Sequence, residues 1–158
     1  MIQEVEVNDL IDACEADALA RFPLVKYPID HAFIPYPDGW YLYERTVHMA
    51  KGTLLTSATH AVEHFYNLSQ GSFAVIDTLG NKVVIKAPAR GITKPDTRRL
   101  VYVLEDIIFT TYLMTKKTDP EEVVAATTRP NENPLLSEDT KLALSQIRSD
   151  MPTIKELT

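Results

Sequence analysis

Apolar residues recur with a helical spacing near the start of the chain, between residues 8 and 22. Asn8 is a favourable N-cap for this predicted helix, and Pro23 is expected to end it. Residues 23–39 carry four prolines, so we expect them to be extended and irregular. The positions predicted to share the buried helix face are Leu10, Ile11, Cys14, Ala18, Leu19 and Phe22.

A long middle region is rich in β-forming residues and alternates between apolar and polar positions. Residues 78–81, "TLGN", have the composition of a tight turn between two strands. The region therefore predicts six to eight short strands. The segments that carry strand-like patterns are 40–49, 52–60, 64–77, 82–88 and 98–115.

Helical signals return after this region. Asp119 is suited to an N-cap, Pro120 to the first helical position and Glu122 to the third, which predicts a short helix over 120–127. Residues 128–134 read as a loop, and Ser137 is expected to cap a last helix that runs to about residue 149.

Together these patterns predict a mainly β chain, a small barrel or sandwich with helices at both ends. We divide the sequence into an N-terminal helix and proline-rich arm (1–30), a β-barrel (31–117) and a C-terminal helical segment (118–158).

The composition and charge of the chain exclude several classes of function. The chain has 158 residues, 45% of them hydrophobic, which is enough for one domain with a full core. Its formal charge of -6 argues against nucleic-acid binding, because that function usually needs a basic face. Cys14 is the single cysteine, which excludes an internal disulfide. No apolar run approaches a membrane span and no signal-peptide pattern is present, so a cytoplasmic protein without membrane contact is expected.

The stretch "HAVEH" contains His60, Glu63 and His64, and has the spacing of the inverted zinc-protease motif. That motif requires one helix that carries both histidines. The flanking residues are mostly Thr, Phe, Tyr, Val and Ile, so strands are expected on both sides and the protease interpretation is rejected. We instead expect His60 to end one strand and His64 to begin the next, with both side chains directed into a barrel interior.

The segment 51–77, "KGTLLTSATHAVEHFYNLSQGSFAVID", resembles the first motif of the cupins, G-x5-H-x-H-x(3,4)-E-x6-G. Gly52, His60, the Glu63/His64 pair and Gly71 match this motif in order. Residues 87–106 resemble the second motif, P-x4-H-x3-N, with Pro88 at its start. The resemblance implies a single cupin-type barrel, that is, a double-stranded β-helix or jelly roll.

Over residues 28–127 the chain more closely resembles cupin-like proteins encoded by tailed bacteriophages and prophages, mostly of unassigned function. This resemblance implies a host-cell cytoplasmic or virion location and a phage-type binding or accessory protein. The residues that carry it are His31 and Phe33, Tyr43 and Arg45, Gly52-Thr53, His60/Glu63/His64, Gln70-Gly71, Ala87-Pro88, Arg98-Arg99 and Glu105-Asp106 with Thr110-Thr111.

A full cupin site holds iron, manganese, nickel or zinc with three histidines and one glutamate. Here the resemblance leaves His60 and His64 as the secure ligands, with Glu63 a third if it points inward and His48 a further candidate. The first histidine of the motif falls on Ala58, and the histidine of the second motif falls near Arg98. The expected cofactor is therefore either none or a weakly bound divalent transition metal. His31 is a candidate to fold over the barrel mouth.

The guanidinium of Arg98, a cation where the motif has a histidine, would favour an anionic ligand in the same space. Of the adjacent pair Glu105 and Asp106, one is expected to face the core or the pocket, with Arg98, Arg99 or Arg45 as its partner. The residues predicted to line a small-ligand site are Arg45, Arg98, Tyr43, Tyr112 and Glu105.

Three functions stay open at this point. The first is a non-catalytic binding or accessory protein with a small polar pocket, and the second is a structural oligomer or virion component. The third is a metal-dependent oxygenase or isomerase of the cupin sort. A homo-oligomer is expected in each case, because pairing covers exposed sheet edges.

Overall fold

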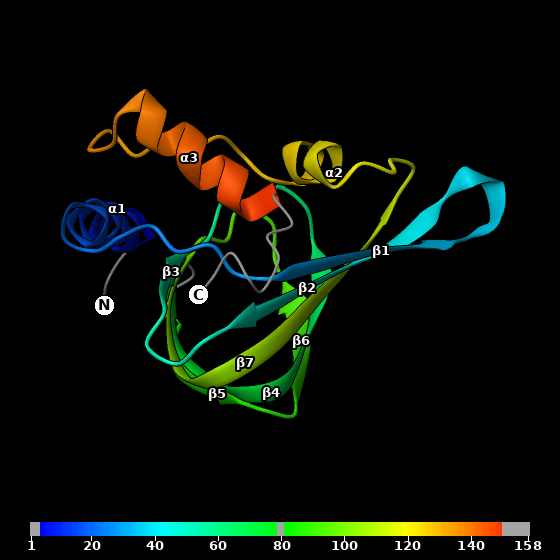
Figure 1. Ribbon diagram of the computed structural model, residues 1–158, viewed down its shortest axis with the longest axis horizontal. Coiled ribbons are helices and arrows are strands. Elements are labelled where there is room, and N and C mark those ends of the chain that lie inside the picture. Colours follow the sequence, from blue (N-terminus) through cyan, green and yellow to red (C-terminus); the bar gives the residue numbers. More distant parts are fainter. Residues whose placement is uncertain (1–3, 79–80, 150–158) are drawn as a thin grey trace.

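The computed structural model describes residues 4–78 and 81–149, which form one strongly curved antiparallel sheet with helices on one side (Figure 1). The predicted class, mainly β with helices at both ends, is confirmed. The elements are α1 (Glu4–Arg21), β1 (Ile29–Pro35), a 3-10 helix (Pro37–Gly39), β2 (Tyr41–Met49), β3 (Leu54–Thr56), β4 (His64–Asp77), β5 (Lys82–Lys86), β6 (Ala89–Thr93), β7 (Arg99–Thr115), α2 (Pro120–Thr127) and α3 (Glu138–Ser149).

Two long strands, β4 and β7, form the centre of the sheet. The strand order is β1-β2-β7-β4-β5, while β3 also pairs with β7 and β6 also pairs with β4. Each long strand thus has different neighbours along its two halves: β7 pairs with β3 near Val101 and with β2 from Ile107 onward. This arrangement curls the sheet around an interior space.

A β-bulge bends β4 at its middle. The register between β4 and β7 shifts at three points between Leu68 and Phe73. Gly71 lies within this bulge with a φ of 81°, in the left-handed region that glycine tolerates. A Cβ atom at Gly71 would overlap the backbone oxygen of Asp106, so the close approach of β7 also requires glycine here.

The core occupies the concave side of the sheet. Leu68 and Val103 are completely buried, and Phe73 lies among them from β4. Val47 of β2 and Ile107 of β7 join the same cluster. Burial of this apolar cluster is the main force that closes the sheet on itself.

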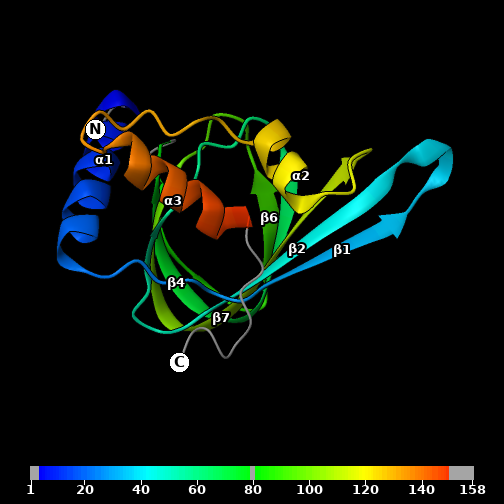
Figure 2. The same cartoon turned by 45° about the horizontal axis from the view of Figure 1, so that its top comes forward.

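The helices lie on one side of the barrel. Figures 1 and 2 show α2 and α3 lying over the same side of the barrel, with α1 beside β3. The β1–β2 hairpin projects away from the barrel in both views. Among the helices of the residues described, none combines the length and the apolar character that crossing a bilayer requires.

The helix starts after the barrel were predicted well. Asp119 caps α2 by accepting a hydrogen bond from the backbone N–H of Glu121, at 3.1 Å. Ser137 Oγ accepts from the backbone N–H of Thr140, at 3.2 Å, at the start of α3. Both contacts satisfy donors that have no partner within the helix.

Three predictions about the first 39 residues were wrong in detail. Asn8 does not cap α1, because the helix begins at Glu4 and Asn8 lies within it. The buried face includes Asp12 and Glu15, whereas Phe22 is 64% exposed, because α1 packs on a polar cluster. The proline-rich arm was expected to be irregular, but residues 29–35 pair with β2 throughout the strand.

Candidate functional site

The interior of the barrel holds a cavity of about 150 Å³. Its apolar wall comes from the core, and α2 contributes Val123, Val124 and Thr127 at its helical side. The polar residues that line it are Tyr27, Tyr43, Arg45, Ser57, His60, His64, Arg99, Thr111, Thr127 and Thr128. The described residues that line the cavity include two arginines and two histidines but no aspartate or glutamate.

His60 and His64 both face this cavity, as the sequence predicted. His64 is the first residue of β4 and pairs with Thr93 of β6. His60 follows β3 and is held by two backbone hydrogen bonds, one to the oxygen of Thr97 at 3.1 Å and one from the N–H of Asp96 at 2.7 Å. The two imidazole ring centroids lie 4.7 Å apart with an interplanar angle of 65°.

The environment of His64 favours its neutral form. Burial lowers the pKa of His64, and the nearby charge of Arg99 lowers it further. The hydrogen bond between His64 Nδ1 and the backbone oxygen of Val62, at 3.2 Å, acts in the opposite direction. His64 therefore lines the cavity as an uncharged hydrogen-bonding group at neutral pH.

Tyr43 and Arg45 reach the cavity from β2, because residues two apart on a strand share one face. His31 pairs with Arg45 across β1 and β2, and its Nδ1 lies 2.5 Å from the hydroxyl of Tyr43. Burial, followed by the charge of Arg45, lowers the pKa of His31 to about 4. Burial raises the pKa of Tyr43 to about 12. His31 thus contacts Tyr43 but does not line the cavity itself. The expectation that it folds over the barrel mouth is wrong.

Arg99 lines the cavity, whereas the sequence analysis named it only as a possible partner of Glu105 or Asp106. Its guanidinium carbon lies 5.5 Å from the ring centroid of Tyr66, in a cation–π arrangement. Burial lowers the pKa of Arg99, while Tyr66 and Asp77 act to raise it. The signal was present in the strand alternation, since Arg99 has the same phase as the buried Val101 and Val103.

Arg98 was predicted for the pocket, and the structure corrects this. Its side chain points away from the cavity, toward α1. There its guanidinium pairs with Asp12 at 2.5 Å and with Glu15 at 3.1 Å. Asn8 also accepts a hydrogen bond from Arg98, at 3.1 Å. Because successive strand residues point in opposite directions, Arg98 joins the sheet to α1 while Arg99 enters the barrel.

Glu105 and Tyr112 do not line the cavity either. Glu105 and Asp106 are both exposed, which contradicts the expectation that one of them faces inward. The bulge shifts the β7 register beside them, and Asp106 accepts a hydrogen bond from the backbone N–H of Lys51 at 2.8 Å. Tyr112 is in the opposite phase to Thr111 and Leu113, which do face the cavity.

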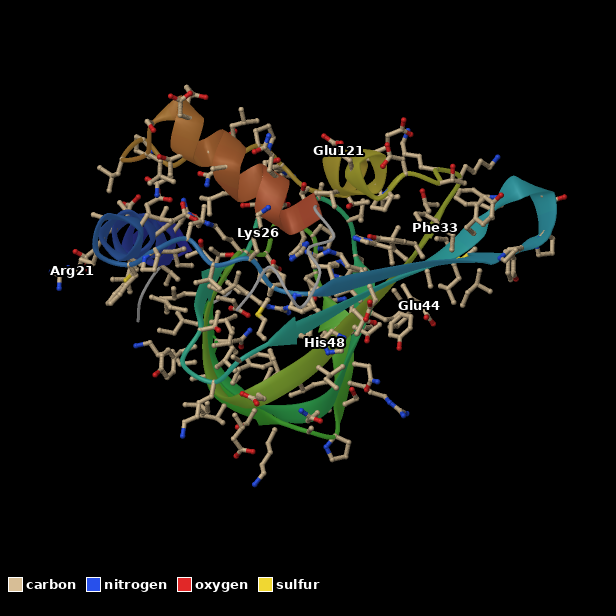
Figure 3. The ribbon with its side chains drawn as sticks, in the orientation of Figure 1. Arg21, Lys26, Phe33, Glu44, His48 and Glu121 are labelled. Carbon is tan, nitrogen blue, oxygen red and sulfur yellow. The ribbon has the colours of Figure 1, made fainter. Side chains whose placement is uncertain are left out.

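The two additional candidate metal ligands point elsewhere. Glu63 is exposed and pairs with Lys94 at 2.7 Å. His48, labelled on β2 in Figure 3, lies 3.0 Å from the carboxylate of Asp30 and does not line the cavity. Among the residues described, no group of three or more His, Cys, Asp or Glu side chains is placed to hold a metal ion. With two imidazoles beside a guanidinium, this donor set does not fit a stable divalent-metal site.

Comparison with known proteins gives similarity at the level of structure alone. No protein-family model matches the chain, and no curated protein matches its sequence. Similar solved structures include the cupin domain of Cnp3 from Schizosaccharomyces pombe, with 13% identity, a TM-score of 0.45 and coverage of 61% of this chain and 67% of that one.

Two further similar structures come from bacteria. A cupin superfamily protein from Desulfitobacterium hafniense has 8% identity and a TM-score of 0.40, with coverage of 58% of this chain and 81% of that one. KdgF from Halomonas sp. has 15% identity and a TM-score of 0.39, with coverage of 52% and 86%.

Proposed function

We propose that this chain is a binding protein that holds a small organic anion inside its barrel. The observation that carries the proposal is the composition of the cavity wall, with Arg45, Arg99, His60 and His64 on it and no acidic residue among the described lining residues. Arg45 and Arg99 are half-buried cations on this wall. An anion in the same space accepts charge-assisted hydrogen bonds from a guanidinium, which are stronger than those between neutral groups.

The size of the cavity limits the ligand. A cavity of about 150 Å³ accommodates a molecule of about the size of benzene. Phe73, Ile107 and Phe109 offer apolar contacts to the body of such a molecule. Arg45 and Arg99 are the groups that would hold its charged end, and Tyr43 adds a phenolic hydroxyl in the cavity wall.

Calorimetric titration with benzoate and with benzamide tests this function, because the two molecules are similar in size and differ in charge. We expect benzoate to bind at least tenfold more tightly, since hydrogen bonds to charged groups contribute about 1.5–3 kcal/mol. Arg45→Met should weaken benzoate binding about tenfold or more, while Arg90→Met, at an exposed position on β6, should change it less than twofold. Equal binding of the two molecules would contradict an anion site.

The projecting hairpin supports a second candidate, a structural role in a homo-oligomer. Tyr36 is 61% exposed and Ile34 is 44% exposed on this hairpin, which stands clear of the barrel (Figure 2). β1 is also an edge of the sheet, where unpaired backbone groups favour pairing with another strand. An accessory protein of phage type, as the sequence resemblance implies, is compatible with either role. Sedimentation analysis of the wild type and of Tyr36→Asp tests the oligomer.

A further inference from the structure

The position of Arg99 depends on two residues outside the cavity wall. Tyr66 lies on the inner face of β4, two residues after His64, and its ring stacks on Phe109 with a centroid distance of 5.3 Å. The guanidinium of Arg99 lies over the same ring. Phe109, Tyr66 and Arg99 therefore form a layered arrangement in which the tyrosine ring supports the arginine.

Gly91 of β6 makes room for this ring. Gly91 pairs with Tyr66 in the antiparallel register between β4 and β6. A Cβ atom at position 91 would lie 2.6 Å from the Tyr66 hydroxyl oxygen and 2.7 Å from the ring carbon that carries it. These distances are well inside van der Waals contact, so any side chain at position 91 forces the tyrosine ring to move.

A carboxylate, that of Asp77, lies near Arg99 and acts on its charge. Asp77 lies opposite Arg99 in the register between β4 and β7, and it is 5% exposed. Its carboxylate accepts hydrogen bonds from the backbone N–H and the side-chain amide of Asn81, at 3.0 and 2.8 Å. The negative charge of Asp77 acts to raise the pKa of Arg99, which helps the guanidinium to keep its charge beside the cavity.

We infer that Gly91 and Tyr66 are positioning residues that present the Arg99 guanidinium to the cavity, and that the ligand is a monocarboxylate with a compact apolar body. This inference rests on the proposed function and specifies its ligand class. A planar guanidinium held in one orientation matches the two oxygens of a planar carboxylate. The apolar floor around Phe73 and Ile107 disfavours strongly hydrated inorganic anions such as phosphate and sulfate.

Titrations of benzoate, benzamide and inorganic phosphate against the wild type and four variants test the inference. Gly91→Ala and Tyr66→Leu should weaken benzoate about tenfold and leave benzamide within twofold, so that the ratio of the two affinities falls toward that of Arg99→Met. Tyr66→Phe keeps the aromatic face and should retain the wild-type ratio. A merely structural role for Gly91 would weaken benzoate and benzamide together.

A double variant tests whether Gly91→Ala weakens benzoate binding through Arg99 or in another way. In the Arg99→Met background, Gly91→Ala should have no further effect on benzoate, because its target is already absent. If Gly91→Ala fails to fold, Tyr66→Leu carries the same comparison. An unchanged benzoate-to-benzamide ratio in Tyr66→Leu, or phosphate binding tighter than benzoate, would overturn the inference. Failure of the wild type to bind benzoate at all would instead overturn the proposed function on which it rests.

Discussion

Arg98 and Arg99 are adjacent in sequence, yet their guanidinium groups lie on opposite sides of the barrel wall. Arg98 makes a buried ion pair with Asp12 and Glu15 of α1, whereas Arg99 lines the interior cavity. The alternation of strand side chains produces this division. One arginine therefore attaches the N-terminal helix to the sheet, and the other is available to a ligand.

The first prediction concerns this division of roles. Arg98→Met should lower the free energy of unfolding by about 3–5 kcal/mol, because it leaves two buried carboxylates without their cation. Arg99→Met should be much less destabilising and should weaken benzoate binding. Urea unfolding of both variants, with Arg90→Met as the exposed control, measures the difference. If Arg98→Met unfolds at the same urea concentration as Arg90→Met, the ion pair does not attach α1.

The acid sensitivity of the protein should depend on Glu15. Burial acts to raise the pKa of Glu15, but hydrogen bonds from Thr56, Asn133 and Asn131, together with the charge of Arg98, lower it below 4.5. A lowered pKa in the folded state means that the unfolded state binds protons first. The stabilisation by Glu15 is therefore present above about pH 4.5 and is lost as the pH falls through the lower, folded-state value.

Denaturation of Glu15→Gln between pH 3 and pH 7 checks this expectation. The variant should be less stable than the wild type at pH 7, and its stability should fall less steeply below pH 4.5. Glu138→Gln is the matched control, because the Glu138 side chain is 91% exposed. A Glu15→Gln variant with the same pH profile as the wild type would contradict the assignment.

Two glycines with a positive φ should respond differently to alanine. Gly71→Ala should destabilise by about 3–5 kcal/mol, because backbone strain adds to the overlap with Asp106 in the bulge. Gly52 has a φ of 89° but nothing within 4 Å of a Cβ atom, so Gly52→Ala should cost about 1–2 kcal/mol. Thermal unfolding compares the two variants. Similar losses would show that the bulge can relax around a methyl group.

Metal removal is expected to leave the fold intact. With two imidazoles and a guanidinium in the cavity, protein purified without added metal should carry well under one equivalent of zinc or iron. A chelator should not change the melting temperature, and His60→Ala should keep most of the stability, because no metal holds the barrel together. Elemental analysis that finds one tightly bound metal per chain, lost in His60→Ala together with a collapse of the melting temperature, would favour the metal-enzyme alternative.

Much of the fold followed from local sequence signals. The α2 boundaries agree with the prediction because Asp119 and Pro120 fix the helix start through backbone chemistry. His60 and His64 were also expected to face one interior space and both line the cavity, although β3 ends at Thr56 and His60 forms an isolated bridge with Thr128 instead of ending a strand. Both features depend on residues that are close together in sequence, so the local sequence pattern is enough to predict them.

The errors in the site involve relations between distant segments. The odd-numbered β7 residues 99, 101, 107, 109, 111 and 113 all line the cavity, so the strand keeps one phase, and Tyr112 faces away from the cavity. Glu105 has the inward phase but is exposed where β7 pairs with the bulged part of β4. The pairing of α1 with Arg98 spans more than 80 residues, as in the Arg98–Glu15 hydrogen bond with a separation of 83. Alternation along β7 gives the relative phase of Arg99 and Tyr112, but it does not show that β4 is bulged beside Glu105 or that α1 packs against Arg98.

The location of a bound carboxylate tests the central claim most directly. Nuclear Overhauser effects between the ring protons of benzoate and the methyl groups of the protein would place the ligand. The account predicts contacts to Val101, Ile107 and Val123, which surround the cavity. Contacts confined to outward-facing methyl groups such as that of Val84, which is 63% exposed, would contradict an anion site inside the barrel.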